Sequence, residues 1–376
     1  MAYGSSFHKP REDSALQTPK FLLSSRRRAR GLLSIKVIIP VLFLATVVVA
    51  LIVSMGEATA PKHLRYTTVT GFFKQDDPAT DSATFDYTKE NFGLINRSYD
   101  TDSVFDDSAQ KTQWQRFERY VSHLNEETSK DVHYKVLYLG RHGEGYHNVA
   151  EAFYGTKAWD CYWSLQNGNE TSTWADAHLT SLGIAQARTN QAFWNQQIQR
   201  QKMQTPESYY TSPLTRCLQT ANETFSGLPL SRDSPFTPTI KELFREVIGV
   251  HTCDRRSTRS YIAALFPDWR FEDGFQEDDQ LWSPELRETG PAHDVRSRQV
   301  LDDVFTTDAK ALISVTAHSG AIASLLRVLG HRVYKLGTGQ IIPVFVKAEM
   351  VDGELPDPGD TEWEKPETCE KPPALV

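Results

Sequence analysis

Short apolar runs alternate with helix-forming segments through the middle of this 376-residue chain. The run YKVLYL at residues 134–139 ends at Gly140 and is typical of a buried strand. Alternating strands and helices predict a three-layer α/β/α fold with a mostly parallel central sheet, in which ligands bind at the carboxyl ends of the strands. Further strands are expected at residues 207–211, 312–317 and 341–346, and helices at 182–198 (with Thr180 as N-cap), from about Leu214, and at 321–329.

Polar side chains follow three of these strands. Arg141 and His142 come after the first strand, Arg216 follows the second, and His318 and Ser319 follow the third. Because parallel strands bring their carboxyl ends together, the two arginines and two histidines should converge. Guanidinium groups pair with phosphate oxygens, a neutral imidazole can attack phosphorus, and a helix that begins near Ser319 would point N–H groups at an anion. The pattern predicts a phosphoryl pocket that needs no metal.

Five blocks of sequence strengthen this interpretation because they occur in the order of a known family. On these blocks, over about residues 130–350, the chain resembles the histidine phosphatase superfamily in its phosphoglycerate-mutase-like branch. Any single block would be weak evidence, whereas five in order are specific. The blocks are LGRHGEGYHN at 139–148, LTSLGIAQA at 179–187, SPLTR and QTA within 212–221, LFRE at 243–246 and AHSG at 317–320.

The resemblance implies roles for individual residues. His142 would be the nucleophile that becomes phosphohistidine. Arg141, Arg216 and His318 would hold the phosphoryl oxygens, and Asn148 would be a further contact. The substrate would be a small-molecule phosphate ester, and no cofactor is expected.

A carboxyl group completes the implied site. Glu246 matches the family's acid, which protonates the leaving oxygen and later deprotonates water. Three other nearby acids could serve instead: Glu144, Glu242 and Asp254.

Two further histidines, His147 and His251, could line the substrate pocket. The spacing of His142 and His147 could suggest a metal pair, but no carboxylate lies at ligand spacing, so no metal site is expected.

The motifs also depart from those of glycolytic mutases. Those enzymes share Ser and Trp at the two positions where this chain has Gly145 and His147. The segment after Glu246 looks more like that of the mutase-like phosphatases of fungi and plants, whose fungal members include membrane-anchored ones. Hydrolysis of a phosphomonoester is therefore favoured over mutase-type phosphoryl transfer. A catalytically silent membrane glycoprotein that uses the fold for binding is the alternative from another class.

The N-terminal region predicts a membrane anchor. Residues 37–55 form 19 residues without a charge, about the length that crosses a hydrocarbon core of ~30 Å, and five basic residues precede them between Arg26 and Lys36. Positive flanks stay in the cytoplasm, so the body should lie in the secretory lumen or outside the cell, as in a single-pass type II protein. A cleaved signal peptide and a buried core helix remain as alternatives.

The body carries features that agree weakly with a luminal position. Sequons begin at Asn96, Asn169 and Asn222, which are candidate glycosylation sites. All four cysteines follow the predicted anchor and could form two disulfides in any of three pairings.

The remaining organisation follows from composition. We expect a basic cytoplasmic tail at 1–36, the anchor at 37–55, a stem at 56–112 that could pack in part on the domain, a catalytic domain at 113–350, and an acidic, proline-rich, solvated tail at 351–376. Residues 1–36 hold eight of the 41 basic residues and two of the 48 acids, so the rest of the chain is strongly acidic. Such a body has no general attraction for nucleic acid.

Overall fold

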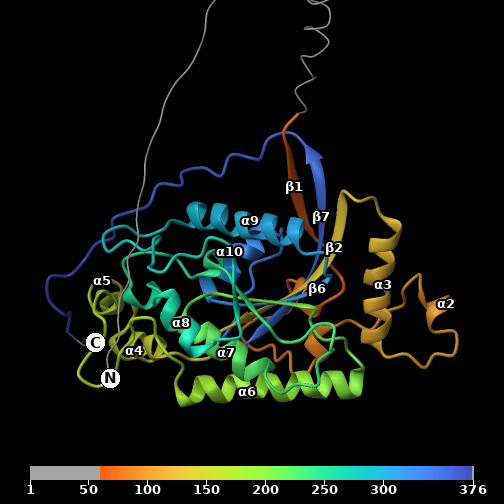
Figure 1. The fold of residues 1–376 in the computed structure, drawn as a ribbon, viewed down its shortest axis with the longest axis horizontal. Coiled ribbons are helices and arrows are strands. Elements are labelled where there is room, and N and C mark those ends of the chain that lie inside the picture. Colours follow the sequence, from red (N-terminus) through yellow and green to blue (C-terminus); the bar gives the residue numbers. More distant parts are fainter. Residues whose placement is uncertain (1–59, 375–376) are drawn as a thin grey trace, which may run out of the picture. The chain divides into compact units, whose positions relative to one another are not determined.

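The computed structural model describes residues 60–374 (Figure 1). The predicted cytoplasmic tail and membrane anchor lie outside this range. Between residues 60 and 374, no helix combines the length and the hydropathy that a membrane crossing requires.

A seven-stranded sheet forms the centre of the described domain, with the order β1-β7-β2-β6-β3-β4-β5. The neighbouring pairs β2–β6, β6–β3, β3–β4 and β4–β5 are parallel. Strand β7 pairs antiparallel with both β2 and β1. The predicted α/β fold with a mostly parallel sheet is confirmed. The strands are β1 (Lys62–Thr68), β2 (Val132–Arg141), β3 (Ser208–Thr211), β4 (Thr239–Ile240), β5 (Arg270–Phe271), β6 (Leu312–Ala317) and β7 (Ile341–Asp352).

Helices cover both faces of this sheet, as the alternating side chains of β2 show. Leu137 and Leu139 pack into one hydrophobic cluster, and Val136 and Tyr138 pack into another. Successive strand residues point to opposite faces, so the two clusters lie on opposite sides of the sheet. The helices are α2 (Asp102–Phe105), α3 (Gln113–Glu127), α4 (Tyr146–Tyr154), α5 (Thr156–Cys161), α6 (Ser181–Gln196), α7 (Thr215–Phe225), α8 (Arg259–Leu265), α9 (Gly290–Thr307) and α10 (Ser319–Val328).

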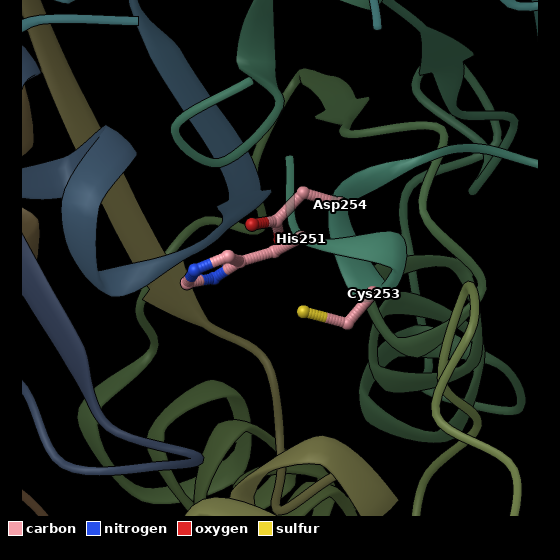
Figure 2. Close-up of side chains that lie close together, drawn as sticks. All are labelled: His251, Cys253 and Asp254. Carbon is pink, nitrogen blue, oxygen red and sulfur yellow. The ribbon is translucent and has the colours of Figure 1, made fainter. Parts of the chain in front are cut away.

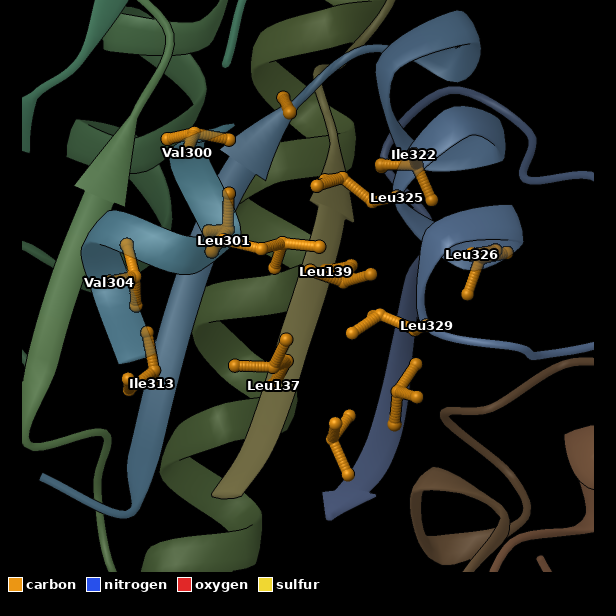
Figure 3. Close-up of a cluster of buried hydrophobic side chains, with 14 of the residues drawn as sticks. Leu137, Leu139, Val300, Leu301, Val304, Ile313, Ile322, Leu325, Leu326 and Leu329 are labelled. Carbon is orange, nitrogen blue, oxygen red and sulfur yellow. The ribbon is translucent and has the colours of Figure 1, made fainter. Parts of the chain in front are cut away.

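The first cluster joins β2, β6 and β7 to α9 and α10 (Figure 3). Leu301 and Val304 of α9 and Leu325 of α10 are at most 2% exposed. Complete burial of such a side chain contributes roughly 1.5–3 kcal/mol relative to an exposed position. This packing fixes the start of α10, and with it the end of β6, against the sheet.

The second cluster is largely aromatic and includes side chains from α3 and α6. Trp114 of α3, Trp194 of α6 and Phe92 are fully buried in it. Thr180 caps α6 as predicted, since it accepts a hydrogen bond from Gly183 N–H, and Thr112 caps α3 in the same way by accepting one from Gln115 N–H.

The segment expected to be a stem contributes directly to the folded domain from residue 62 onward. Strand β1 is the edge of the sheet, and Phe72, Phe73 and Tyr87 are buried in the aromatic cluster. These isolated aromatic residues lack the periodicity that would have shown their burial in the sequence.

The acidic C-terminal segment begins inside the sheet, since β7 continues to Asp352. Beyond β7 the segment is mostly exposed, but its distal part is attached to the domain at two points. The backbones of Arg287 and Glu364 exchange two hydrogen bonds of 2.8 and 2.9 Å. A disulfide joins Cys161, the last residue of α5, to Cys369. Of the pairings that the sequence leaves open, the structure therefore contains this one bond, and Cys217 and Cys253 are free and buried.

Candidate active site

The predicted site residues meet at the carboxyl ends of β2, β3 and β6. His142 directly follows β2, and its N–H donates to the carbonyl of Ala317 at the end of β6. His318 is the N-cap of α10, and Arg216 lies in the first turn of α7, just after β3. The ring centroids of His142 and His318 are 5.1 Å apart. The convergence expected from parallel strands is confirmed.

His142 is held as a neutral tautomer with its lone pair on Nε2. Its Nδ1 lies 2.7 Å from the carbonyl oxygen of Gly143, which can only accept, so Nδ1 carries the proton. The side chain is 1% exposed, and its burial, together with the charges of Arg216 and Arg141, holds the pKa of His142 well below its usual range. A neutral imidazole with a free Nε2 is the form that can act as a nucleophile.

Arg216 is fixed by three partners although it is only 1% exposed. Its Nη2 donates to Asp254 at 3.0 Å and its Nη1 to the Cys253 carbonyl at 2.6 Å. Its Nε donates to Nδ1 of His318 at 3.2 Å. A buried guanidinium is stable only with such compensation, so these contacts define the position of its remaining donors.

His318 takes the opposite tautomer from His142. Because a guanidinium can only donate, Nδ1 of His318 accepts from Arg216 and Nε2 carries the proton, which points to Ser212 Oγ at 2.8 Å. Burial and the charge of Arg216 hold the pKa of His318 well below its usual range. His318 is thus beside His142, but protein groups engage both of its ring nitrogens.

Arg141 and Asn148 complete the predicted phosphate contacts. Arg141 donates from Nη1 to the Leu336 carbonyl at 2.8 Å, and its buried Nε has no partner among residues 60–374. The side-chain oxygen of Asn148 accepts from the Gly145 N–H at 3.0 Å, at the start of α4. Its amide NH₂ group is not used in that bond. Both residues line the cavity and retain hydrogen-bond donors for an anion.

Glu246 occupies the N-terminal end of α10. One carboxylate oxygen accepts from the Gly320 N–H at 3.0 Å, and the other accepts from the N–H of Val247 at 3.0 Å. A Cβ on residue 320 would clash with the Glu246 carboxylate, so the glycine makes room for this acid. Ser319 Oγ lies 3.4 Å from the same carboxylate.

The three alternative acids are engaged by other protein groups, and of the three only Asp254 lines the cavity. Glu144 accepts from the hydroxyl of Thr180 at 2.7 Å and does not line the cavity. Asp254 is paired with Arg216, and Glu242 contacts Arg245 and Arg256. Of the four candidates, Glu246 has the position that fits proton transfer best.

A cavity of about 190 Å³ is lined by His142, Arg216 and Glu246, together with Arg141, Asn148 and Ser319. His147 and His251 line it, as the sequence suggested. Burial lowers the pKa of His251 to about 4, with Arg287 as a second cause. Burial and Arg216 hold the pKa of His147 well below its usual range. Both imidazoles are therefore neutral near pH 7.

Five residues of the cavity lining were not predicted from the sequence: Glu151, Trp159, Asp160, Cys253 and Arg287. Glu151 follows His147 by four residues on α4, and this spacing places both on one helix face. That signal could have found Glu151. Asp160 and Arg287 come from segments with no motif, so only the tertiary structure reveals them.

His251, Cys253 and Asp254 form a compact group whose ligand-type atoms lie within 4.8 Å of one another (Figure 2). The oxygens of Asp254 already face Arg216 at 3.0 Å and Arg287 at 3.6 Å. Burial raises the pKa of the Cys253 thiol well above its usual range, whereas metals bind the thiolate. The contacts of this group fit a role in positioning Arg216 and Arg287 better than a role as a metal centre.

The three sequons differ in accessibility. Asn96 and Asn169 are exposed, whereas Asn222 is half-buried in α7 and accepts a hydrogen bond from the hydroxyl of Ser226.

Comparison with known proteins places this geometry in context. Residues 137–337 match the family model of the "Histidine phosphatase superfamily (branch 1)". A "Probable phosphoglycerate mutase" of Arthroderma benhamiae is 51% identical over 307 residues, which are 82% of this chain and 91% of the relative. "Phosphomutase-like protein 3" of Candida albicans is 35% identical over 83% of this chain and 89% of its own length. A solved mycobacterial glucosyl-3-phosphoglycerate phosphatase aligns with a TM-score of 0.34 and 16% identity over 58% of this chain and all of the other.

Proposed function

The chain belongs to the histidine phosphatase superfamily, and on that premise we propose that it is a metal-independent phosphomonoesterase with a phosphohistidine intermediate. One observation carries the proposal more than any other. The unprotonated Nε2 of His142 belongs to a cavity whose lining also includes Arg141 and Arg216. A nucleophile flanked by two guanidinium groups suits transfer of a dianionic phosphoryl group.

In the first step, Nε2 of His142 attacks phosphorus. The N–P bond forms while the bond between phosphorus and the alcohol oxygen breaks, and the electron pair leaves with that oxygen. The carboxyl group of Glu246 gives its proton to the departing alkoxide. Arg141 and Arg216 donate hydrogen bonds to the phosphoryl oxygens, which spread charge as the transition state forms.

In the second step, water attacks the phosphohistidine. The Glu246 carboxylate takes a proton from this water as its oxygen bonds to phosphorus. The N–P bond breaks, its electron pair returns to Nε2, and inorganic phosphate is released. His142 and Glu246 are then ready for another cycle. Because the arginines supply the positive charge throughout, the reaction requires no divalent ion.

The same site residues could also support mutase-type transfer, and the relative from Arthroderma benhamiae is named a probable phosphoglycerate mutase. Hydrolysis is favoured here because this chain has Gly145 and His147 at the two positions where glycolytic mutases share Ser and Trp. The choice between the two outcomes depends on what receives the phosphoryl group, water or a second alcohol.

The first test is turnover in the presence of a chelator. We expect the protein to release phosphate from p-nitrophenyl phosphate in excess EDTA at an unchanged rate. His142→Ala should abolish turnover, and Arg216→Ala should slow it by roughly 10²–10³, the usual effect of one donor to a developing anion.

Loss of activity in EDTA with recovery on adding a divalent ion would contradict the mechanism. Formation of 2-phosphoglycerate from 3-phosphoglycerate without phosphate release would favour the mutase.

The second test separates Glu246 as a proton donor from Glu246 as a structural residue. An alkyl alkoxide needs a proton to leave, whereas p-nitrophenolate leaves well without one. Glu246→Gln should therefore slow phosphorylation of His142 by an alkyl phosphate roughly 10²–10⁴-fold and by p-nitrophenyl phosphate far less. The step is measured as a pre-steady-state burst, because the attack by water uses the same carboxyl.

Glu144→Gln is the matched control for this experiment. It removes a carboxylate that bonds Thr180 and does not line the cavity, so the ratio of the two burst rates should stay at the wild-type value. Equal losses for both leaving groups in Glu246→Gln would mean that Glu246 only supports the start of α10.

We further propose that residues 37–55 anchor the protein in a membrane, with the catalytic domain in the secretory lumen or outside the cell. The disulfide between Cys161 and Cys369 supports an oxidising compartment. The exposed sequons at Asn96 and Asn169 agree with glycosylation there. Endoglycosidase should increase the protein's electrophoretic mobility, and sealed vesicles should protect the domain from added protease. Digestion of the domain from the cytosolic side would rule out this topology.

A further inference from the structure

The cavity has a buried floor and an exposed mouth. This difference in solvent exposure defines where each part of a substrate must lie. On the floor, His142 and Arg216 line the cavity and are each 1% exposed. At the mouth, the side chain of Asp160 is 57% exposed and that of Arg287 is 23% exposed, and Glu151 is half-buried. Because phosphorus must reach His142, the alcohol part of the ester has to pass these three residues.

The mouth carries more negative than positive charge. Glu151 and Asp160 supply two carboxylates, and Arg287 supplies one guanidinium. Arg287 is already occupied, since its Nη1 donates to the Gly249 carbonyl at 2.7 Å and lies 3.6 Å from Asp254. His147 and His251 are neutral near pH 7 and add no compensating charge.

The backbone segments that carry Asp160 and Arg287 are attached to the C-terminal segment. Asp160 directly precedes Cys161, which is bonded to Cys369. Arg287 is paired through its backbone with Glu364. In addition, the carboxylate of Asp160 lies 3.8 Å from Nε2 of His251, a residue of the inner wall. The backbone on this side of the cavity is therefore attached to the domain through the C-terminal segment.

We propose that Glu151 and Asp160 are specificity-determining residues that restrict the substrate to phosphate esters whose alcohol part carries no negative charge. This inference rests on the proposed phosphatase function. A second anionic group, such as the carboxylate of a phosphoglycerate, would lie near two carboxylates in a partly desolvated cavity, where like charges repel more strongly than in bulk water. An uncharged, hydroxylated alcohol would meet hydrogen-bond acceptors instead.

Glycerol 3-phosphate and 3-phosphoglycerate provide a matched pair of probes. They have similar size and differ in a neutral CH₂OH group against a carboxylate. Each is measured as a competitive inhibitor of p-nitrophenyl phosphate hydrolysis, so the comparison does not require that either be turned over. The wild-type protein should bind glycerol 3-phosphate more tightly, by roughly three- to tenfold for each carboxylate at the mouth.

The variants Glu151→Gln, Asp160→Asn and their combination remove the charges while keeping the shapes. Each should tighten binding of 3-phosphoglycerate more than that of glycerol 3-phosphate, and the double variant should come near to equal affinity. The matched control is Glu127→Gln, which removes one exposed carboxylate at the end of α3, away from the cavity. It should leave the ratio of the two inhibition constants unchanged. Raising the salt to about 1 M, where the Debye length is ~3 Å, should reduce the wild-type preference.

The outcomes separate this inference from the function on which it rests. If the wild-type protein does not hydrolyse p-nitrophenyl phosphate at all, the proposed phosphatase function fails. If it hydrolyses that ester but binds 3-phosphoglycerate as tightly as glycerol 3-phosphate, or does not bind glycerol 3-phosphate, the phosphatase stands and the charge selection is wrong. A preference that persists in the double variant would also overturn the assignment to Glu151 and Asp160.

Discussion

A buried guanidinium organises the chemistry of this site. Burial is the main cause that lowers the pKa of His142, His147 and His318, and among neighbouring charges Arg216 has the largest effect on all three. Arg216 also donates a hydrogen bond directly to His318. Asp254 and the Cys253 carbonyl compensate its burial. Burial first, and this cation second, lower the pKa of His142 and so favour the unprotonated nucleophile, and the same cation supplies hydrogen-bond donors for an incoming phosphate. Loss of its partner Asp254 would leave an uncompensated charge, which is why the pair behaves as a unit.

The sequence predicted the inner part of the site because it lies next to regular structure. His142 and His318 follow buried strands, and Arg216 begins a helix, so strand order alone brings them together. Their roles came from the resemblance to a family rather than from spacing. The strand at 312–317 agrees with β6 residue for residue, because an apolar run of β-branched residues between turns leaves little choice.

The outer part of the site could not be predicted in the same way. Asp160 lies on a short helix, and Arg287 lies in a loop, with neither in a motif. Their positions depend on contacts with the C-terminal segment, through the Cys161–Cys369 bond and the backbone pairing of Glu364. The composition of that segment indicated only exposure to solvent. A polar segment can therefore be exposed along most of its length and still define the wall of a cavity.

The chemical state of His142 is the central claim, and the position of the phosphoryl group on its ring tests it most directly. Because Nδ1–H donates to the Gly143 carbonyl, only Nε2 has a lone pair for phosphorus. Rapid quenching at alkaline pH during turnover, followed by peptide mapping and ³¹P NMR, should find one phosphohistidine, at His142, with phosphorus on Nε2. Phosphorus on Nδ1, a modified residue other than His142, or turnover with no phosphoenzyme at all would contradict the account.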